Sequence, residues 1–248
     1  MKAVLLVGGL GTRLRSAVPK LPKTLASVGD KPFLELLVRQ LESQELHQLV
    51  MCTGYLAEQI QEVFQDGSAF GATIEYSQET APLGTAGALK FAQQYLQNES
   101  EILVINGDTF LEIDFNDFIL SHRKHGGLAT MAVVPVENSS RYGTVQVGAD
   151  GRILGFLEKR DQAAPGIVNA GVYVFSTAVL ELISLGPVSL ERDVFPSLVE
   201  RGFYAIEQRG VFIDIGTPDD YAQARKMSDR LADASFYRHG RVSPAGAS

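Results

Sequence analysis

The segment KAVLLVGGLGTRLRSAVPKLPKTL covers residues 2–25 and decides the fold. Its first part, residues 2–7, is a short apolar run that is typical of a buried strand. Gly8 and Gly9 end the run at once. A buried strand that leads directly into glycines is typical of an open α/β sheet, in which ligands bind outside the carboxyl ends of the strands.

The same strand is followed by a regular alternation of apolar runs and amphipathic stretches. The predicted helix over 55–65 places Leu56, Ile60, Val63 and Phe64 on one face. Such a strand–helix rhythm implies parallel pairing in a doubly wound sheet with helices on both faces. The predicted strands are 2–7, 49–53, 72–77 and 102–106, and the predicted helices are 31–44, 55–65 and 85–97.

The second half has closely spaced apolar runs, which indicate antiparallel strands added to the same sheet. Thr217 is the expected N-cap of the last helix, and Pro218 takes its first position. The predicted strands are 128–136, 143–148, 152–159 and 167–176, and the predicted helices are 189–201 and 217–233. We therefore expect one α/β domain over residues 1–233, with a doubly wound, Rossmann-like mixed sheet, and a loose polar tail over 234–248.

The composition excludes several classes of protein. The chain has 248 residues and a formal net charge of −7, which disfavours nucleic acid as a partner. A single cysteine, Cys52, rules out an internal disulfide and a cysteine-rich zinc site. The first apolar run is too short for a signal peptide, and no apolar stretch reaches the length of a membrane span. These observations predict a cytoplasmic protein with no membrane or nucleic-acid partner.

Cations gather directly after the first strand. Gly8, Gly9 and Gly11 lack side chains, so backbone N–H groups there can approach a phosphate closely. Four cations follow within eleven residues of an otherwise acidic chain: Arg13, Arg15, Lys20 and Lys23. This concentration indicates a ligand with several phosphate groups.

Several common motifs are absent from the sequence. A dinucleotide fingerprint needs glycine where Leu14 stands, and a P-loop needs glycine before its lysine, where Pro22 precedes Lys23. The D-x-D pattern of many glycosyltransferases is broken, because Phe110 follows Asp108 and Thr109. No G-x-S-x-G elbow supports a serine hydrolase.

Two carboxylates stand out by their apolar surroundings. Asp108 lies just past the end of the strand predicted over 102–106, where a carboxylate suits Mg²⁺. Asp214 lies within the run VFIDIG, and burying an ionised carboxylate without a partner is costly. Either a metal shared with Asp108 or a pairing with a basic side chain would remove that cost.

The loop GGLGTRL (residues 8–14), followed by Pro22 and Lys23, resembles the signature of the sugar-phosphate nucleotidyltransferases. That family joins a nucleoside triphosphate to a sugar 1-phosphate and releases pyrophosphate. The resemblance extends from residue 2 to about 222 and implies the nucleotide-diphospho-sugar transferase fold. It implies that Arg13 and Lys23 are catalytic, and that Asp108 and Asp214 bind Mg²⁺.

The segment QETAPLGTAGALK (residues 78–90) resembles the base-recognition loop of that family. Its GTAGAL form is similar to the loops of guanylyl- and uridylyltransferases, although small residues are also typical of a well-packed helix start. The resemblance implies a nucleotide site made of Val7, Gly8, Gly9, Gly11, Thr12, Gln78, Gly84, Thr85 and Asp108.

Two later segments resemble the part of the family that binds the sugar phosphate. They are GFLEKR (residues 155–160) and VNAGVYVF (residues 168–175). A solvated Glu–Lys pair in the first segment and a β-bulge in the second are the alternatives without a ligand. The resemblance implies a sugar-phosphate site made of Gly143, Glu158, Lys159, Asn169 and Gly171.

Three segments narrow the resemblance further. LRSAVPKLPK (14–23), KPFLE (31–35) and SLERDVFPSLV (189–199) resemble guanylyltransferases that act on D-glycero-α-D-manno-heptose 1-phosphate. This favours GTP and that heptose phosphate as substrates, for a cell-surface polysaccharide. Mannose 1-phosphate guanylyl transfer, uridylyl transfer to another sugar phosphate, and a non-catalytic nucleotide-sugar sensor stay open, as does the choice between monomer and homodimer.

Overall fold

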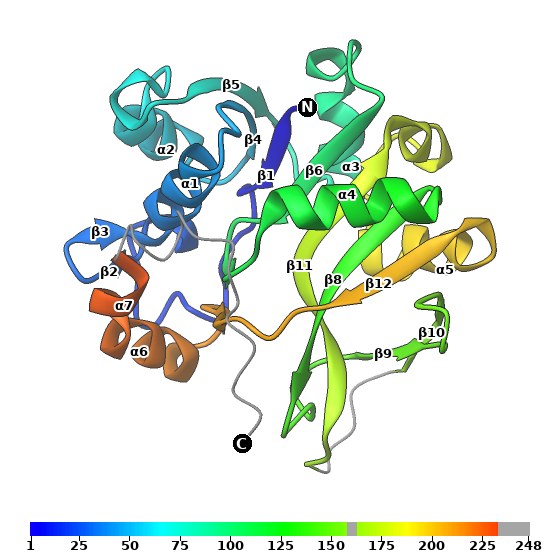
Figure 1. Ribbon diagram of the computed structural model, residues 1–248. Coiled ribbons are helices and arrows are strands. Elements are labelled where there is room, and N and C mark those ends of the chain that lie inside the picture. The colour runs from blue at the N-terminus through cyan, green and yellow to red at the C-terminus, as the bar shows by residue number, and fades with distance from the viewer. Residues whose placement is uncertain (158–162, 233–248) are drawn as a thin grey trace.

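Strand β1 (Ala3–Leu6) lies inside a nine-stranded sheet in the computed structural model, which describes residues 1–157 and 163–232 (Figure 1). Its neighbours β4 (Gln48–Thr53) and β6 (Glu101–Asn106) both run parallel to it. Strand β5 (Thr73–Gln78) continues the parallel part beyond β4. The alternation in the first half of the sequence therefore predicted the parallel strands correctly.

The second half adds mostly antiparallel strands to the same sheet. Strand β11 (Gly166–Ser176) pairs antiparallel with β6, and β8 (Ala129–Val136) pairs antiparallel with β11. The far end of β11 also pairs with β9 (Thr144–Val147), which pairs with β10 (Ile153–Leu157). Strand β12 (Phe203–Glu207) runs parallel to β8. The expected mixed sheet is confirmed.

Two apolar cores lie on the two faces of the sheet. Side chains of successive strand residues point to opposite faces, so Ala3 and Leu5 join one core while Val4 joins the other. The first core packs under α1 (Phe33–Ser43), α2 (Ala57–Phe64) and α4 (Phe115–His125). The second packs under α3 (Gly84–Phe91) and α5 (Phe195–Leu198).

Two short strand pairs lie outside the large sheet. Strand β2 (Ser27–Val28) pairs with β3 (Lys31–Pro32). Strand β7 (Thr109–Leu111) pairs antiparallel with β13 (Phe212–Asp214), and this register sets Asp214 opposite Thr109. Segments about a hundred residues apart in the sequence therefore meet beside the carboxyl end of β6.

Three helix predictions need correction. The helix expected over 31–44 begins at Phe33, because Pro32 belongs to β3. The helix expected over 55–65 begins at Ala57, and Val63 is 40% exposed instead of facing the core. The helix expected over 217–233 is divided into α6 (Pro218–Lys226) and α7 (Ser228–Ala232). The tail predicted over 234–248 lies outside the described residues.

Helix α4 is missing from the sequence prediction, although its signals are present. The carboxylate of Asp114 accepts a hydrogen bond from the Asp117 N–H, which caps the start of the helix. Gly126 ends it with a left-handed backbone conformation. The buried residues Phe115, Phe118 and Ile119 form its apolar face. In the described part of the chain, no helix is both long and apolar enough to cross a membrane.

The cap of α6 gives a test of local stability. The Thr217 hydroxyl accepts a hydrogen bond from the Asp220 N–H, as the sequence predicts. We expect Thr217→Ala to lower the free energy of unfolding by about 1 kcal/mol, because an orphan helix N–H loses its acceptor. Thr217→Ser keeps the hydroxyl and should unfold like the native chain. Urea unfolding followed by circular dichroism measures the difference, and equal values for both variants would contradict the capping role.

Candidate active site

A cavity of about 440 Å³ lies beyond the carboxyl ends of β1, β4 and β6. This volume falls within the range of pockets that hold organic ligands of moderate size. Its walls come from the glycine loop after β1, the start of α3, the bulged middle of β11 and the β7–β13 pair. The position agrees with the sequence prediction of a ligand site at the strand ends.

The first glycines form one wall of the cavity. Val7, Gly8 and Gly9 line it, as predicted, and the Val7 N–H donates a hydrogen bond to the Cys52 carbonyl at 3.0 Å. A Cβ atom at Gly8 would lie only 3.1 Å from the Gly54 nitrogen, whereas one at Gly9 would meet nothing within 4 Å. Gly8 is therefore needed for close packing between the ends of β1 and β4, and Gly9 leaves open space beside the backbone.

Gly11 and Thr12 do not line this cavity, contrary to the prediction. Gly11 has a φ of +60°, and a Cβ atom there would lie 3.0 Å from the Lys23 Cβ. It is thus a turn residue that makes room for Lys23. Thr12 is exposed on the turn that follows.

Only two of the four predicted cations reach the cavity. Arg13 and Lys23 line it, whereas Arg15 and Lys20 do not. The Lys23 ammonium forms an ion pair with the Asp108 carboxylate, and the two side chains are 15% and 26% exposed. A partly buried cation beside a carboxylate is suited to contact a phosphate group.

The two predicted metal-binding carboxylates lie in the same part of the cavity. Both Asp108 and Asp214 line it, and the Ile215 N–H donates to the Asp108 carbonyl at 3.0 Å. Burial raises the pKa of Asp214, and the negative charge of Asp108 raises it further. A hydrogen bond from the Gly216 N–H to Asp214 Oδ1, 2.6 Å long, and the nearby Lys23 oppose this rise.

Glu79, and not the predicted Gln78, faces the cavity. Gln78 ends β5 on the outer surface, where it forms hydrogen bonds with Gln61 and Glu58 of α2 at 3.2 and 3.3 Å. The Glu79 carboxylate accepts a hydrogen bond from the Leu83 N–H at 3.2 Å. Burial raises its pKa. A Cβ atom at Gly8 would lie 3.3 Å from Glu79 Oε1, so the carboxylate abuts the glycine loop.

The start of α3 forms the opposite wall. Gly84 and Thr85 both line the cavity, as predicted. Gly84 has a φ of +72°, and a Cβ atom there would lie 2.5 Å from the Val188 carbonyl oxygen. The Thr85 hydroxyl accepts a hydrogen bond from the Leu190 N–H at 2.8 Å. This part of α3 is therefore held against the segment that precedes α5.

The predicted sugar-phosphate residues are only partly brought together. Asn169 and Gly171 line the cavity at a bulge of β11, where the register with β8 shifts. Asn169 Oδ1 accepts the Gly171 N–H at 2.9 Å, and its amide donates to the Tyr173 hydroxyl at 2.7 Å. Gly143 does not line the cavity. Glu158 and Lys159 lie outside the described residues.

Three polar residues of the cavity are absent from the sequence prediction: Thr24, Asn106 and Glu191. The Thr24 hydroxyl and Asn106 Oδ1 are buried and have no hydrogen-bond partner within the described residues. Glu191 accepts hydrogen bonds from the hydroxyls of Ser189 and Thr85 at 3.0 and 3.3 Å. Asn106 had a signal, because it is the one polar residue in the run ILVIN (102–106).

Comparison with known proteins agrees with this geometry. The family model described as nucleotidyl transferase matches residues 2–230. The chain belongs to this family. The resemblance found in the sequence is thus confirmed over nearly the whole described part of the chain.

Individual relatives of this family member include two kinds of guanylyltransferase. The D-glycero-alpha-D-manno-heptose 1-phosphate guanylyltransferase of Aneurinibacillus thermoaerophilus is 39% identical over 229 residues, which are 91% of this chain and 97% of that protein. The mannose-1-phosphate guanylyltransferase catalytic subunit beta of Danio rerio is 38% identical over 225 residues. The chain spans 62% of the length of that protein.

A solved structure of a relative confirms the fold. The chain is similar to HddC from Yersinia pseudotuberculosis, crystallised in complex with GMP-PN, with a TM-score of 0.82 and 33% identity. The match covers 91% of this chain and 98% of HddC. The predicted mixed α/β sheet in a single domain is therefore the fold of a nucleotidyltransferase of this family.

Proposed function

We propose that this nucleotidyltransferase joins GTP to a sugar 1-phosphate and releases pyrophosphate. The observation that carries the proposal is the cavity in which Arg13 and Lys23 face Asp108 and Asp214 beside the Gly8–Gly9 backbone. Cations and open backbone suit a triphosphate, and paired carboxylates suit a metal that bridges phosphates. A non-catalytic sensor would not need Lys23 and both carboxylates at one point of the cavity.

D-glycero-α-D-manno-heptose 1-phosphate is the sugar substrate that we propose first. The heptose 1-phosphate guanylyltransferase matches over 97% of its own length, whereas the mannose-1-phosphate enzyme of Danio rerio matches over 62%. Mannose 1-phosphate is the alternative sugar. The product, a GDP-sugar, would supply a glycosyl transfer reaction that builds a cell-surface polysaccharide.

The reaction requires positioning and charge neutralisation more than proton transfer. An oxygen of the sugar phosphate is already anionic and attacks the α-phosphorus of GTP, while the bond to pyrophosphate breaks. Lys23 would neutralise charge that develops on the α-phosphate, and Arg13 would bind the departing pyrophosphate. Asn106 and Asn169 would contact the sugar phosphate at the end of the cavity near β11.

Mg²⁺ is the cofactor that we propose. Among the described residues, no three histidine, cysteine or carboxylate side chains gather into a metal cluster. Mg²⁺ fits the two carboxylates present, because it uses one or two of them together with phosphate oxygens. Asp108 and Asp214 would hold the ion, whose charge would offset the repulsion that raises the pKa of Asp214. When bound, the ion would stabilise negative charge on the reacting phosphates.

Glu79 supports guanine as the base. Guanine carries its N1–H and 2-amino donors on one edge, and a carboxylate offers two acceptor oxygens to such a pair. Uracil, cytosine and adenine do not present two adjacent donors of this kind. Glu79 lines the cavity next to Gly8, and its Oε2 atom is fixed by the Leu83 N–H.

This role of Glu79 predicts a change in base selectivity. ITP lacks the 2-amino group, and a hydrogen bond to a charged group is worth about 10- to 100-fold in affinity. We expect the native chain to prefer GTP over ITP by about that factor in kcat/KM, and Glu79→Gln to remove most of the preference. Gln78→Ala, which alters the neighbouring residue outside the cavity, should leave the ratio unchanged. An unchanged ratio in Glu79→Gln would show that another group recognises the base.

The experiment that tests the proposed function is pyrophosphate release in the presence of Mg²⁺. GTP, UTP, CTP, ATP and dTTP are each combined with heptose, mannose and glucose 1-phosphates. Release with GTP and the heptose phosphate supports the proposal, and release with mannose 1-phosphate alone corrects the sugar. Nucleotide-sugar binding without release from any pair would indicate the sensor. Because both substrates are charged and do not cross a bilayer unaided, we also propose that the chain acts in the cytoplasm.

A further inference from the structure

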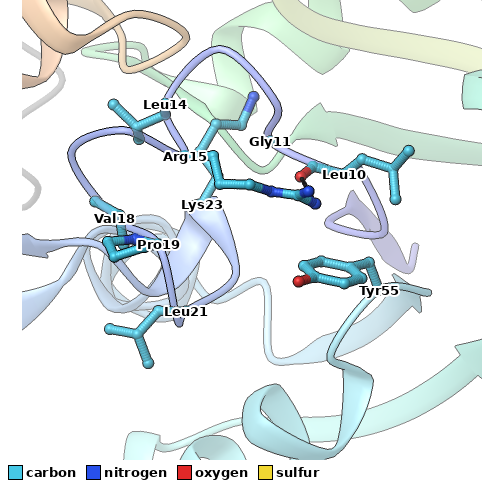
Figure 2. A pocket seen from close by; sticks show the side chains of 9 residues that line it. All are labelled: Leu10, Gly11, Leu14, Arg15, Val18, Pro19, Leu21, Lys23 and Tyr55. Atoms are coloured by element: carbon cyan, nitrogen blue, oxygen red, sulfur yellow. Dashed lines mark hydrogen bonds between the residues drawn. The ribbon is translucent and has the colours of Figure 1, made fainter.

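A second, much smaller hollow lies on the other side of the glycine loop (Figure 2). Its volume is about 10 Å³, which is room for about one water molecule and too little for an organic ligand. It is bordered by the turn after Gly11 and by Tyr55, the second residue after β4. The side chains around this hollow therefore interact with one another.

Arg15 and Tyr55 meet across this hollow. The Arg15 guanidinium lies over the Tyr55 ring, with Cζ 5.2 Å from the ring centroid (Figure 2). The same guanidinium donates a hydrogen bond through Nη2 to the Leu10 carbonyl at 3.4 Å. Arg15 thus connects the backbone of the glycine loop to an aromatic side chain from another segment.

Both partners are fixed at their backbones. Leu14 is 1% exposed, its N–H donates to the Gly11 carbonyl at 3.0 Å, and its carbonyl accepts the Val18 N–H at 3.0 Å. Tyr55 follows Gly54, where a Cβ atom would lie 3.0 Å from the Gly8 carbonyl oxygen and 2.8 Å from Glu79 Oε1. Tyr55 is therefore attached to the same wall of the large cavity that contains Gly8.

Arg15 differs from the cations that face the large cavity. Arg13 and Lys23 line that cavity, and Figure 2 shows the Lys23 side chain extending away from the Tyr55 ring. Arg15 points to the Tyr55 ring, and it forms no ion pair with a carboxylate of the described residues. Its charge is used between two segments of the chain.

We propose that Arg15 and Tyr55 form a clasp that holds the glycine loop in the shape that binds the triphosphate. Both are positioning residues, since they act on the ligand through Leu10 and the backbone of the loop. The inference rests on the proposed function, because it assigns the large cavity to a nucleotide. A cation over an aromatic ring at an exposed site contributes enough to change binding about two- to fivefold.

The test is a double-mutant cycle read by GTP binding in calorimetric titration with Mg²⁺, and by kcat and KM. We expect Arg15→Met and Tyr55→Leu each to weaken GTP binding about two- to fivefold, with kcat nearly unchanged. The double variant should be no weaker than either single variant, because one contact is lost in all three. Tyr55→Phe keeps the ring and should bind like the native chain.

Two results would overturn the clasp. Additive losses in the double variant would show that the two side chains act independently. A loss in Arg15→Met with none in Tyr55→Leu would show that Arg15 contacts phosphate directly. Partial unfolding would lower the amount of active protein without changing its dissociation constant for GTP. Absence of pyrophosphate release by the native chain would count against the proposed function, whereas the binding cycle tests the clasp separately.

Discussion

Lys23→Met should lower kcat by about 100- to 1000-fold with GTP and the heptose phosphate, the range seen when one group that stabilises developing charge is removed. Lys23 lines the cavity and forms an ion pair with Asp108, so its ammonium is held where the phosphates are proposed to react. Methionine has a similar length and no charge. Initial rates of pyrophosphate release at saturating substrates measure the effect.

The matched control for this variant is Lys20→Met. Lys20 is an exposed lysine of the same loop that does not line the cavity, and its replacement should leave kcat within about twofold of the native value. Circular dichroism establishes that both variants are folded. If Lys23→Met kept its rate and only bound nucleotide more weakly, Lys23 would not act on the reacting phosphate.

Asp214→Asn should lose activity while the chain without ligands becomes no less stable. Burial and the charge of Asp108 raise the pKa of Asp214, so its ionised form is less favourable in the folded chain than in the unfolded chain. This cost is present at neutral pH, and it disappears as the pH falls through the raised pKa. Asparagine removes the charge and can still accept the Gly216 N–H. We therefore expect an equal or higher melting temperature without Mg²⁺.

Activity should move in the opposite direction. A metal ligand supports several kcal/mol of transition-state stabilisation, so Asp214→Asn should lower kcat/KM by about 100-fold or more. Asp219→Asn is the control, because Asp219 is exposed in the first turn of α6 and does not line the cavity. It should keep its activity and lose a little stability, since a carboxylate favours a helix start. A lower melting temperature for Asp214→Asn would contradict the account of its environment.

The sequence predicted the sheet well because its strands are buried on both faces. Continuous apolar runs such as residues 2–7 and 102–106 can be buried only in a sheet covered on two sides. The boundary of a helix depends on local capping, which is why the last predicted helix proved to be two. The pairing of β7 with β13 is a contact between distant segments that no local pattern indicates.

The site was predictable where a residue type is required and uncertain where direction matters. Gly8, Lys23 and Asp108 line the cavity because a strand end needs open backbone, a cation and a carboxylate to bind phosphates and a metal. Glu79 replaces Gln78 because successive side chains at a strand end point to opposite sides. Thr24 and Glu191 carry no sequence signal of their own and reach the cavity only through the folding of distant segments.

The proposal that the sugar phosphate attacks the α-phosphorus can be tested most directly by isotope labelling. Heptose 1-phosphate carrying ¹⁸O in its three non-bridging positions is incubated with GTP and Mg²⁺, and the products are analysed by mass spectrometry. We predict that all three labelled oxygens appear in the GDP-sugar and that the pyrophosphate is unlabelled. Label released as inorganic phosphate would show cleavage at the sugar carbon, and it would contradict nucleotidyl transfer.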